Sequence, residues 1–122
     1  MTTVSITAIE NFDYALRMHW QRHPTEDDVR AAFEAIMTKL DSSDRKVYIL
    51  VDITSKPRFP MALTVSLSSL AHRHPSMGDW LVVGEHIMAK FIGSTISTLS
   101  DSKVLWFKTE ADAMGHLASV TI

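Results

Sequence analysis

The segment Lys46–Ser55, KVYILVDITS, decides the fold. Six of the seven residues from Val47 to Ile53 are apolar or aromatic, and four of these are Val or Ile, which fit the pleated surface of a strand. A strand with one face in water alternates polar and apolar residues, whereas this segment is apolar at successive positions. It therefore predicts a central strand that helices cover on both faces.

Asp52 is the charged residue in this run, and the loop residues Thr54–Pro57 follow it. Open α/β sheets usually bind ligands at the carboxyl ends of their strands, where this acid lies. One hypothesis is that Asp52 contacts a ligand or a basic group of a partner. The other is that it is held locally, by hydrogen bonds from the following loop or by an ion pair with Lys56 or Arg58, as buried carboxylates usually are.

The composition indicates a single domain over residues 1–122 and excludes several classes of function. The chain is 46% hydrophobic, which is enough for one core, and its net charge of −2 provides no basic surface for nucleic acid or for a membrane. It contains no cysteine, which excludes disulfides and thiolate chemistry. The sequence has no bilayer-spanning stretch and no signal-peptide pattern, so we expect a cytoplasmic, bacterial protein.

The remaining periodicity predicts the element order β-β-α-β-α-β-α-β-α. Val4–Ile9 and residues 14–21 form an antiparallel hairpin around Asn11, and the second of these strands has one polar face. Thr25 caps the first helix, with Asp28 at the capping-box position. Later strands are predicted at Trp80–Gly84 and Lys103–Phe107, and later helices after Pro60, Gly84 and Thr109.

Each predicted helix has an apolar stripe that we expect to face the core. The stripes are Val29, Ala32, Phe33, Ile36, Met37 and Leu40; then Leu63, Leu67 and Leu70 with Val65 and Ala71; then Ile87, Met88, Phe91, Ile92, Thr95, Ile96 and Leu99; and finally Met114, Leu117 and Ala118.

Two opening strands followed by alternating helices and strands resemble the STAS fold of anti-sigma-factor antagonists, and more closely its SpoIIAA-like branch. The segment VYILVDIT is similar to the third strand of that family, which ends in Asp-x-Ser/Thr, here Asp52 and Thr54. MGDWLVVGEHIMAKFIGSTIS and KVLWFKTEADAMGHL are similar to its last two strands with their following helices. The resemblance implies an α/β domain with a mixed sheet, acting as a small regulatory or binding module rather than as an enzyme.

One departure from the family concerns its phosphorylation switch. Phospho-switched antagonists carry Asp-Ser-Ser-Gly at the amino end of the helix after the third strand, where free N–H groups would meet the phosphate. Aligned on Phe59, this chain has Pro60–Leu63 instead. Thr54, Ser55, Thr64 and Ser66 supply hydroxyls nearby but outside the motif. The resemblance therefore implies the fold without the usual phosphoserine switch.

The residue patterns of metal and catalytic sites are absent from the sequence. His72 and His74 are two residues apart, a spacing that separates them on a helix, and no HExxH motif occurs, so we expect helix-end and surface roles for the six histidines and no metal. Gly-x-Ser-x-Gly and a phosphate-binding glycine loop are also absent. We expect no catalytic residues and no cofactor, and an enzyme using Asp52 with a histidine ranks last.

We expect a binding site at the carboxyl edge of the sheet, formed by the loop after the central strand, the start of the next helix and the Gly84–His86 turn. Its candidate residues are Asp52, Thr54, Ser55, Arg58, Phe59, Met61, Glu85 and His86. Phe59, Met61, Trp80 and Met88 form either a shallow hydrophobic site there or part of the core.

The first functional hypothesis is a non-enzymatic regulatory or protein-binding module whose partner is a protein, with no nucleic acid and no membrane span. The alternative is a carrier of a small apolar or anionic ligand in the crevice at the strand carboxyl ends. The strand at residues 14–21 also offers an edge through which a second copy can pair, giving a homodimer.

Overall fold

Five strands form one sheet in the order β1-β2-β3-β4-β5 in the computed structural model, which describes residues 2–97 and 102–121. β1 pairs antiparallel with β2, and every other neighbouring pair is parallel. The strands are β1 (Val4–Ile9), β2 (Phe12–Trp20), β3 (Val47–Asp52), β4 (Met77–Val83) and β5 (Val104–Phe107). The mixed α/β class and the predicted element order are confirmed.

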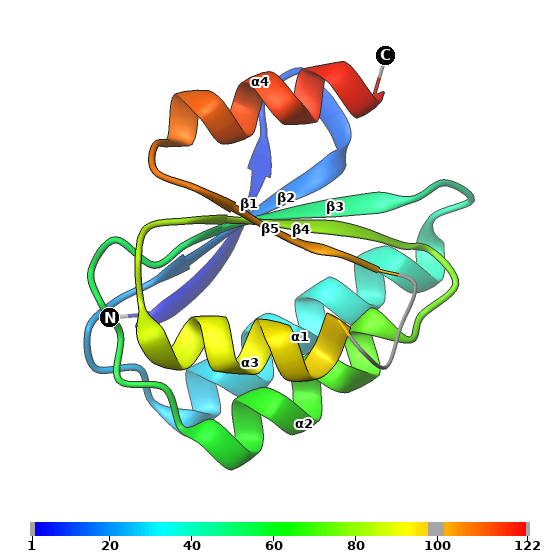
Figure 1. Ribbon diagram of the computed structural model, residues 1–122. Coiled ribbons are helices and arrows are strands. Elements are labelled where there is room, and N and C mark those ends of the chain that lie inside the picture. Colours follow the sequence, from blue (N-terminus) through cyan, green and yellow to red (C-terminus); the bar gives the residue numbers. More distant parts are fainter. Residues whose placement is uncertain (1, 98–101, 122) are drawn as a thin grey trace.

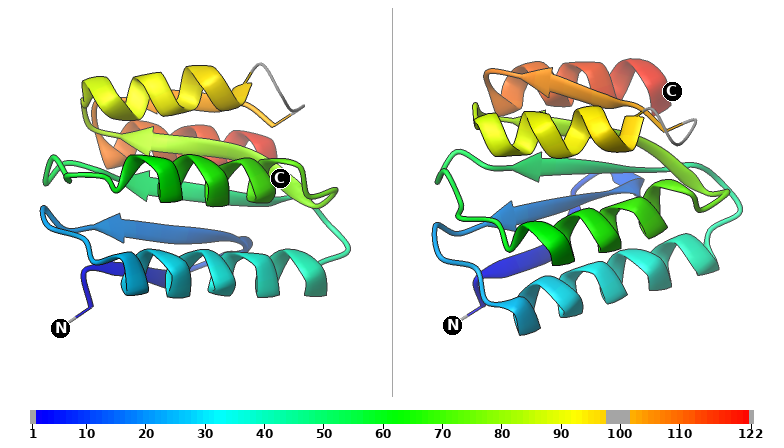
Figure 2. Two further views of the ribbon diagram at one scale, coloured as in Figure 1. Left: turned by 90° about the horizontal axis from the view of Figure 1, so that it is seen from below. Right: turned by 60° about the horizontal axis from the view of Figure 1, so that its bottom comes forward.

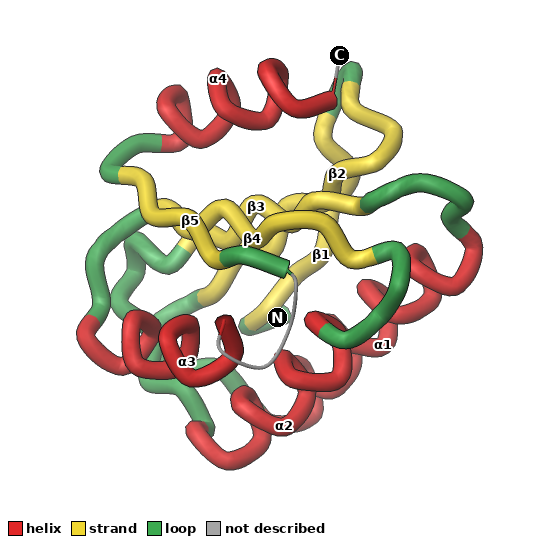
Figure 3. Tube along the Cα trace, turned by 45° about the vertical axis from the view of Figure 1, so that its right-hand side comes forward, coloured by secondary structure: helices red, strands yellow, loops and turns green. Residues whose placement is uncertain are grey.

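Helices cover both faces of this sheet. Figure 1 shows α1 (Glu26–Ser42), α2 (Met61–His72) and α3 (Ile87–Ser97) on one face and α4 (Glu110–Thr121) on the other. The three helices of the first face lie next to one another in chain order, as Figure 2 shows from below. Figure 3 shows the same layers from the side, with the strands between the two helical layers.

β3 lies at the centre of the sheet and is buried on both faces, as its apolar sequence predicts. Val47 and Ile49 are fully buried in the core beneath α1, α2 and α3. Leu50, which alternates with them, is 1% exposed and packs in a second core with Leu81 and Leu117 beneath α4. Because both faces are covered, alternate residues of one strand supply two separate cores.

β2 does not offer the predicted edge for a second copy. It lies between β1 and β3, so both of its hydrogen-bonding edges are already paired within this chain. Its alternation is confirmed in part: Met18 and Trp20 are buried, and Arg17 and His19 on the other face are partly exposed. Ala15 on that face is buried, since α4 covers this end of the sheet. Dimerisation through the residues 14–21 strand is therefore wrong.

The predicted local signals at the first turn and the first helix are confirmed with one change. Asn11 adopts a φ of 70° in the β1–β2 turn, and Thr25 Oγ1 accepts a 3.2 Å hydrogen bond from the Asp28 N–H. The Asp28 carboxylate does not return to Thr25. It accepts 2.7 Å hydrogen bonds from the N–H and the hydroxyl of Thr3, which in turn accepts a 2.9 Å bond from the Thr25 N–H. Thr3 therefore completes the cap, and its N–H and hydroxyl lower the pKa of Asp28.

The predicted stripes of α1 and α4 face the core, and that of α2 does so in part, since Ala71 is buried and Leu63 and Leu67 pack against the core. α2 buries Thr64, Ser68, Ala71 and His72. Leu63 and Leu67 are only partly buried, Val65 is also intermediate, and Leu70 is 55% exposed. Because α2 carries apolar residues on more than one side, their spacing predicts a helix but does not show which side of it faces the core.

The stripe of α3 is also partly wrong. Ile92 and Ile96 are buried as predicted, together with Ala89 and Gly93. The other large members of the stripe lie outside: Ile87 is 85% exposed, Met88 is 42% exposed and Phe91 is 62% exposed. Leu99 lies outside the described residues. α3 thus turns a mixture of small and branched side chains toward the sheet and its bulkiest ones away from it.

Candidate functional site

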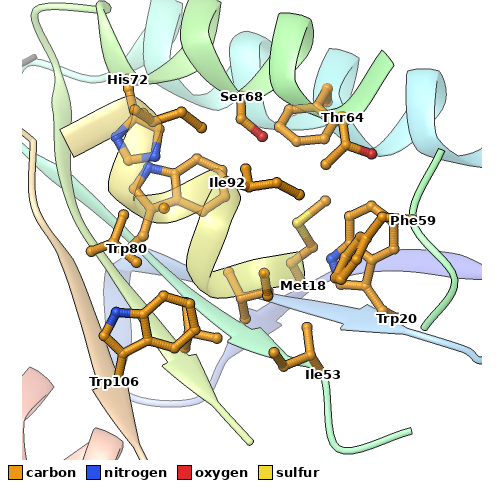
Figure 4. A pocket seen from close by; sticks show the side chains of 17 residues that line it. Met18, Trp20, Ile53, Phe59, Thr64, Ser68, His72, Trp80, Ile92 and Trp106 are labelled. Carbon is orange, nitrogen blue, oxygen red and sulfur yellow. The ribbon is translucent and has the colours of Figure 1, made fainter. Parts of the chain in front are cut away.

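A cavity of about 60 Å³ lies between the sheet and the helices α2 and α3. Figure 4 shows it from close by, with side chains from the sheet on one side and from the helices on the other. Its lining consists of Met18, Trp20, Phe33, Val51, Ile53, Phe59, Thr64, Ser68, His72, Trp80, Val82, Ala89, Ile92, Gly93, Ile96, Val104 and Trp106.

Short side chains on the two helices leave this space open. Thr64 and Ser68 on α2, and Ala89 and Gly93 on α3, face the sheet and are buried. They are too small to fill the layer between helix and sheet to the usual density of a protein interior. A Cβ at Gly93 would lie 3.0 Å from the Trp106 ring, so this glycine also lets α3 approach the sheet closely.

Aromatic rings form a large part of the cavity wall. The chain contains three tryptophans, Trp20, Trp80 and Trp106, and all three line the cavity. Trp80 stacks on Phe33 with ring centroids 6.2 Å apart. Trp20 meets Phe59 edge to face at 4.8 Å. Such pairs hold rings in fixed positions, so the shape of this cavity is set by rigid groups.

Polar atoms without partners concentrate around the same cavity. Five buried side-chain nitrogen and oxygen atoms lack a hydrogen-bond partner in the described part of the chain, and four of them belong to lining residues. These four are Nε1 of Trp20, Nε1 of Trp80, Oγ1 of Thr64 and Nδ1 of His72. Each of these residues is at most 5% exposed. Buried polar groups are normally hydrogen-bonded, so this cluster makes the cavity the candidate site of the molecule.

His72 is the titratable group of the lining. It ends α2, as a helix-end role predicts, but it is 5% exposed, so the expected surface role is wrong for this histidine. Burial lowers the pKa of His72 to about 4, because the cavity wall solvates an imidazolium poorly. The ring is therefore neutral at physiological pH, and it stacks on Trp80.

Asp52 lies in a second cluster, apart from the cavity. Its Oδ1 accepts hydrogen bonds from the N–H of Thr54 at 2.9 Å and from the Thr54 hydroxyl at 2.7 Å. Its Oδ2 lies 3.2 Å from Nδ1 of His19, the residue opposite it on β2. Burial raises the pKa of Asp52, but the hydrogen bonds from Thr54 and His19 outweigh burial and leave this pKa lowered.

These contacts test the two local partners that the sequence suggested for Asp52. The predicted hydrogen bonds from the following loop are confirmed, since Thr54 makes two of them. The predicted ion pair is wrong: among residues 2–97 and 102–121 the ionisable side chain beside Asp52 is His19 rather than Lys56 or Arg58. Asp52 alternates with Val51 and Ile53, which line the cavity, so its side chain points to the opposite face of the sheet.

The loop after β3 and the Gly84–His86 turn do meet, as predicted. Nε2–H of His86 donates a 2.7 Å hydrogen bond to the carbonyl of Pro57, and Nδ1 accepts a 3.1 Å bond from the Met88 N–H at the start of α3. The His86 ring also meets Phe59 at 5.0 Å. Phe59 touches Trp20 as well, so it joins the cavity wall to the surface turn.

The remaining predicted site residues lie around this junction without entering the cavity. The Ser55 hydroxyl donates a 2.5 Å hydrogen bond to the carbonyl of Trp20. Arg58 is exposed and its N–H donates to the Arg22 carbonyl at 2.9 Å. Met61 is half-buried at the start of α2, and Glu85 is exposed. Of the four apolar candidates, Phe59 and Trp80 line the cavity.

Sequence reasoning missed the polar wall of α2. Thr64, Ser68 and His72 are spaced four residues apart, which places them on one side of a helix. The prediction for this helix rested on its leucines and left out this polar stripe. A stripe of Thr, Ser and His within an apolar helix is the signal that could have found the site.

The fold is similar to that of a solved structure from Shewanella loihica PV-4, described as an uncharacterized protein from DUF3478 family with a SpoIIAA-like fold. The two share 14% sequence identity over 93% of this chain and 91% of the other, with a TM-score of 0.68. The chain has the SpoIIAA-like fold. The resemblance of VYILVDIT and the two later segments to the SpoIIAA-like family predicted this fold, and that prediction is confirmed. No family model and no curated protein matches the sequence.

In this SpoIIAA-like domain, Pro60 is the N-cap of α2 and Met61 begins the helix. Nowhere in the described ranges do three His, Asp or Glu side chains come together as metal ligands. No helix in the same ranges has the length and apolar character to cross a membrane.

Proposed function

We propose that this chain is a non-enzymatic binding module that holds a small molecule in the cavity beneath α2 and α3. The observation that carries the proposal is the cluster of four partnerless polar atoms, from Trp20, Thr64, His72 and Trp80, around one apolar cavity. A buried polar atom without a partner costs about 1–3 kcal/mol. A ligand that supplies the missing hydrogen bonds would recover part of this cost on binding.

This proposal develops the carrier hypothesis and moves its ligand. The sequence suggested a crevice at the carboxyl ends of the strands, near Asp52. The partners of Asp52 are already supplied by Thr54 and His19, so that carboxylate has less need of a ligand. The polar atoms of the cavity lack such partners within the described residues, and they lie in an apolar, aromatic-lined space of the kind that binds small molecules.

A regulatory role is a second candidate, and Phe59 favours it. Its ring contacts Trp20 in the cavity wall at 4.8 Å and His86 in the surface turn at 5.0 Å. A ligand that shifts Trp20 would change the packing of Phe59 and therefore the surface around His86. A protein partner that binds the loop Thr54–Phe59 would then distinguish the filled form from the empty form.

Xenon binding to the full chain tests the proposed function, because xenon enters apolar cavities without needing hydrogen bonds. We expect saturable binding by xenon NMR, with shifts at the methyl groups of Ile92 and Val82. Ser68→Leu should abolish it by filling the space, since Ser68 lines the cavity. Ser66→Leu is the matched control, because Ser66 is exposed on the same helix.

Ala89→Leu fills the cavity from α3 and serves as a second variant should Ser68→Leu fold poorly from overpacking. Absence of saturable xenon binding to the wild-type chain overturns the proposal. Unchanged xenon binding in both folded cavity-filling variants overturns it as well.

A further inference from the structure

The four partnerless atoms restrict the chemistry of a ligand. An indole Nε1–H is only a donor, so Trp20 and Trp80 require acceptors. The Thr64 hydroxyl and the neutral His72 ring can each donate as well as accept. Every one of the four atoms can therefore be satisfied by a hydrogen-bond acceptor, whereas a ligand that only donates leaves both indoles unpaired.

The donors lie toward the two ends of the cavity. Figure 4 shows His72 beside Trp80 at one end, with Thr64 on α2 and Trp20 on the sheet toward the other. His72 and Thr64 are eight residues apart on α2, which corresponds to about 12 Å along the helix. Apolar side chains, including Ile92, line the part of the cavity between these two ends. Since these polar atoms are covered by neighbouring side chains in the ligand-free structure, an acceptor would reach an indole N–H at either end through a small shift of those side chains, while the rest of the molecule stays in apolar surroundings.

The lining also disfavours a charged ligand. It consists of aliphatic and aromatic side chains together with the uncharged polar groups of Thr64, Ser68 and His72. An ion entering such a wall gives up its hydration and gains no opposite charge from these groups, and an uncompensated ion of this kind is expensive to bury. Of the apolar and anionic ligands first considered, the apolar class fits this lining.

We infer that the cavity takes a small neutral molecule with an apolar body and a hydrogen-bond-accepting oxygen, such as the carbonyl of a ketone, aldehyde or ester. The inference rests on the proposed function, because it concerns the same cavity. It adds the chemical class: an indole N–H is the group that recognises the oxygen, and the aromatic and aliphatic walls recognise the body.

Butanone and 2-methyl-1-butene test this class, because they share one shape and differ in the accepting oxygen. After subtraction of the free energy of transfer from water to an alkane for each ligand, we expect butanone to bind the full chain at least tenfold more tightly, because only butanone recovers a hydrogen bond in the buried site. The indole N–H signals of Trp20 and Trp80 should shift downfield in NMR with butanone and stay in place with the alkene. Propionate, a charged analogue of similar size, should bind more weakly than either at neutral pH.

Trp80→Phe provides the variant, since it removes an indole N–H and keeps an aromatic ring in contact with His72. Trp106→Phe is the matched control: Trp106 also lines the cavity, but its nitrogen is not among the partnerless buried atoms of the described residues. We expect Trp80→Phe to reduce the preference for butanone over the alkene at least threefold and Trp106→Phe to keep it. Trp20→Phe is the substitute if Trp80→Phe does not fold.

The outcomes separate the two proposals. Saturable xenon binding together with equal transfer-corrected affinities for butanone and the alkene overturns the ligand class and leaves the binding module standing. Tight propionate binding overturns the class as well, because it requires a charge-accepting wall. Absence of xenon binding overturns the proposed function, and the ligand class with it.

Discussion

The imidazole of His72 stacks on the indole of Trp80, with ring centroids 4.8 Å apart and the planes 17° from parallel. The stack helps to keep a histidine in an apolar wall: the indole covers one face of the ring, and burial favours its uncharged form. It also brings two polar atoms without partners in the described chain to the same end of the cavity.

The stability of the protein should fall in mild acid because of His72. Its pKa is lowered from 6.5 to about 4, so between these values the unfolded chain binds more protons than the folded one. Stability from this group is fully present above pH 6.5 and is lost as the pH falls toward 4. Between pH 7 and pH 5 the loss is about 2 kcal/mol, measurable by urea unfolding.

His72→Phe is expected to flatten this pH dependence, because phenylalanine keeps the stack on Trp80 and cannot be protonated. His23→Gln, at an exposed histidine, is the control and should keep the wild-type slope. The same slope in His72→Phe as in the wild type would show that another group is responsible.

Thr64→Val should stabilise the ligand-free protein by about 1 kcal/mol. The two side chains have nearly the same shape, and the Thr64 hydroxyl is buried without a partner among the described residues, so its removal relieves an uncompensated desolvation cost. Chemical denaturation measures the change. Ser66→Ala on the exposed side of α2 should alter stability by less than about 0.5 kcal/mol. A loss of stability in Thr64→Val contradicts the absence of a partner.

Asp52→Asn should leave xenon and butanone binding unchanged, because Asp52 faces away from the cavity. We expect a modest loss of about 1 kcal/mol in stability, since the amide keeps the acceptor for Thr54 but gives up the charge beside His19. Binding and unfolding are measured on the same variant. Weakened xenon binding in a stably folded Asp52→Asn would show that the two clusters are coupled.

Gly93→Ala and Gly115→Ala should shift stability in opposite directions. A Cβ at Gly93 meets the Trp106 ring at 3.0 Å and Val104 Cγ1 at 3.2 Å, so alanine forces α3 away from β5 at a cost of about 1–3 kcal/mol. Around Gly115 no atom of the described chain lies within 4 Å of such a Cβ, and alanine favours the helix by about 0.5–1 kcal/mol. Thermal unfolding compares them, and equal melting temperatures would contradict the close packing at Gly93.

Thr3→Ala should destabilise the junction between β1 and α1 by about 1 kcal/mol. The Thr3 hydroxyl donates to Asp28 and accepts from the Thr25 N–H, so its loss breaks two hydrogen bonds at the start of the helix. Thr2→Ala, at the exposed neighbouring residue, is the control for the effect of the substitution on the chain end. Urea unfolding of the two variants measures the difference.

The sequence predicted the central strand and the caps because these signals are local. Val47–Ile53 carries its burial pattern in consecutive residues, and Thr25 lies three residues from the Asp28 N–H that it caps. The pairing of Asp52 with His19 could not be predicted in this way. It links residues 33 apart in the chain and depends on the register of β2 on β3.

The cavity escaped prediction for a different reason. α2 and α3 are apolar on more than one side, so the helical period did not reveal that Leu70 and Phe91 point outward. An unfilled space results from the meeting of three parts of the fold, namely α2, α3 and the sheet, and no single segment encodes it. The small side chains of Ser68 and Gly93 leave a cavity only because the two helices lie side by side over the strands.

The order of the strands in the sheet follows their order in the chain. Each strand after the first hairpin is added to the open edge left by the one before it, and none is inserted between two earlier strands. Such a sheet can be assembled progressively while the chain emerges from the ribosome, without undoing pairs already formed. β5, which supplies Val104 and Trp106, is then the last strand to join, so the cavity is completed at the end of folding.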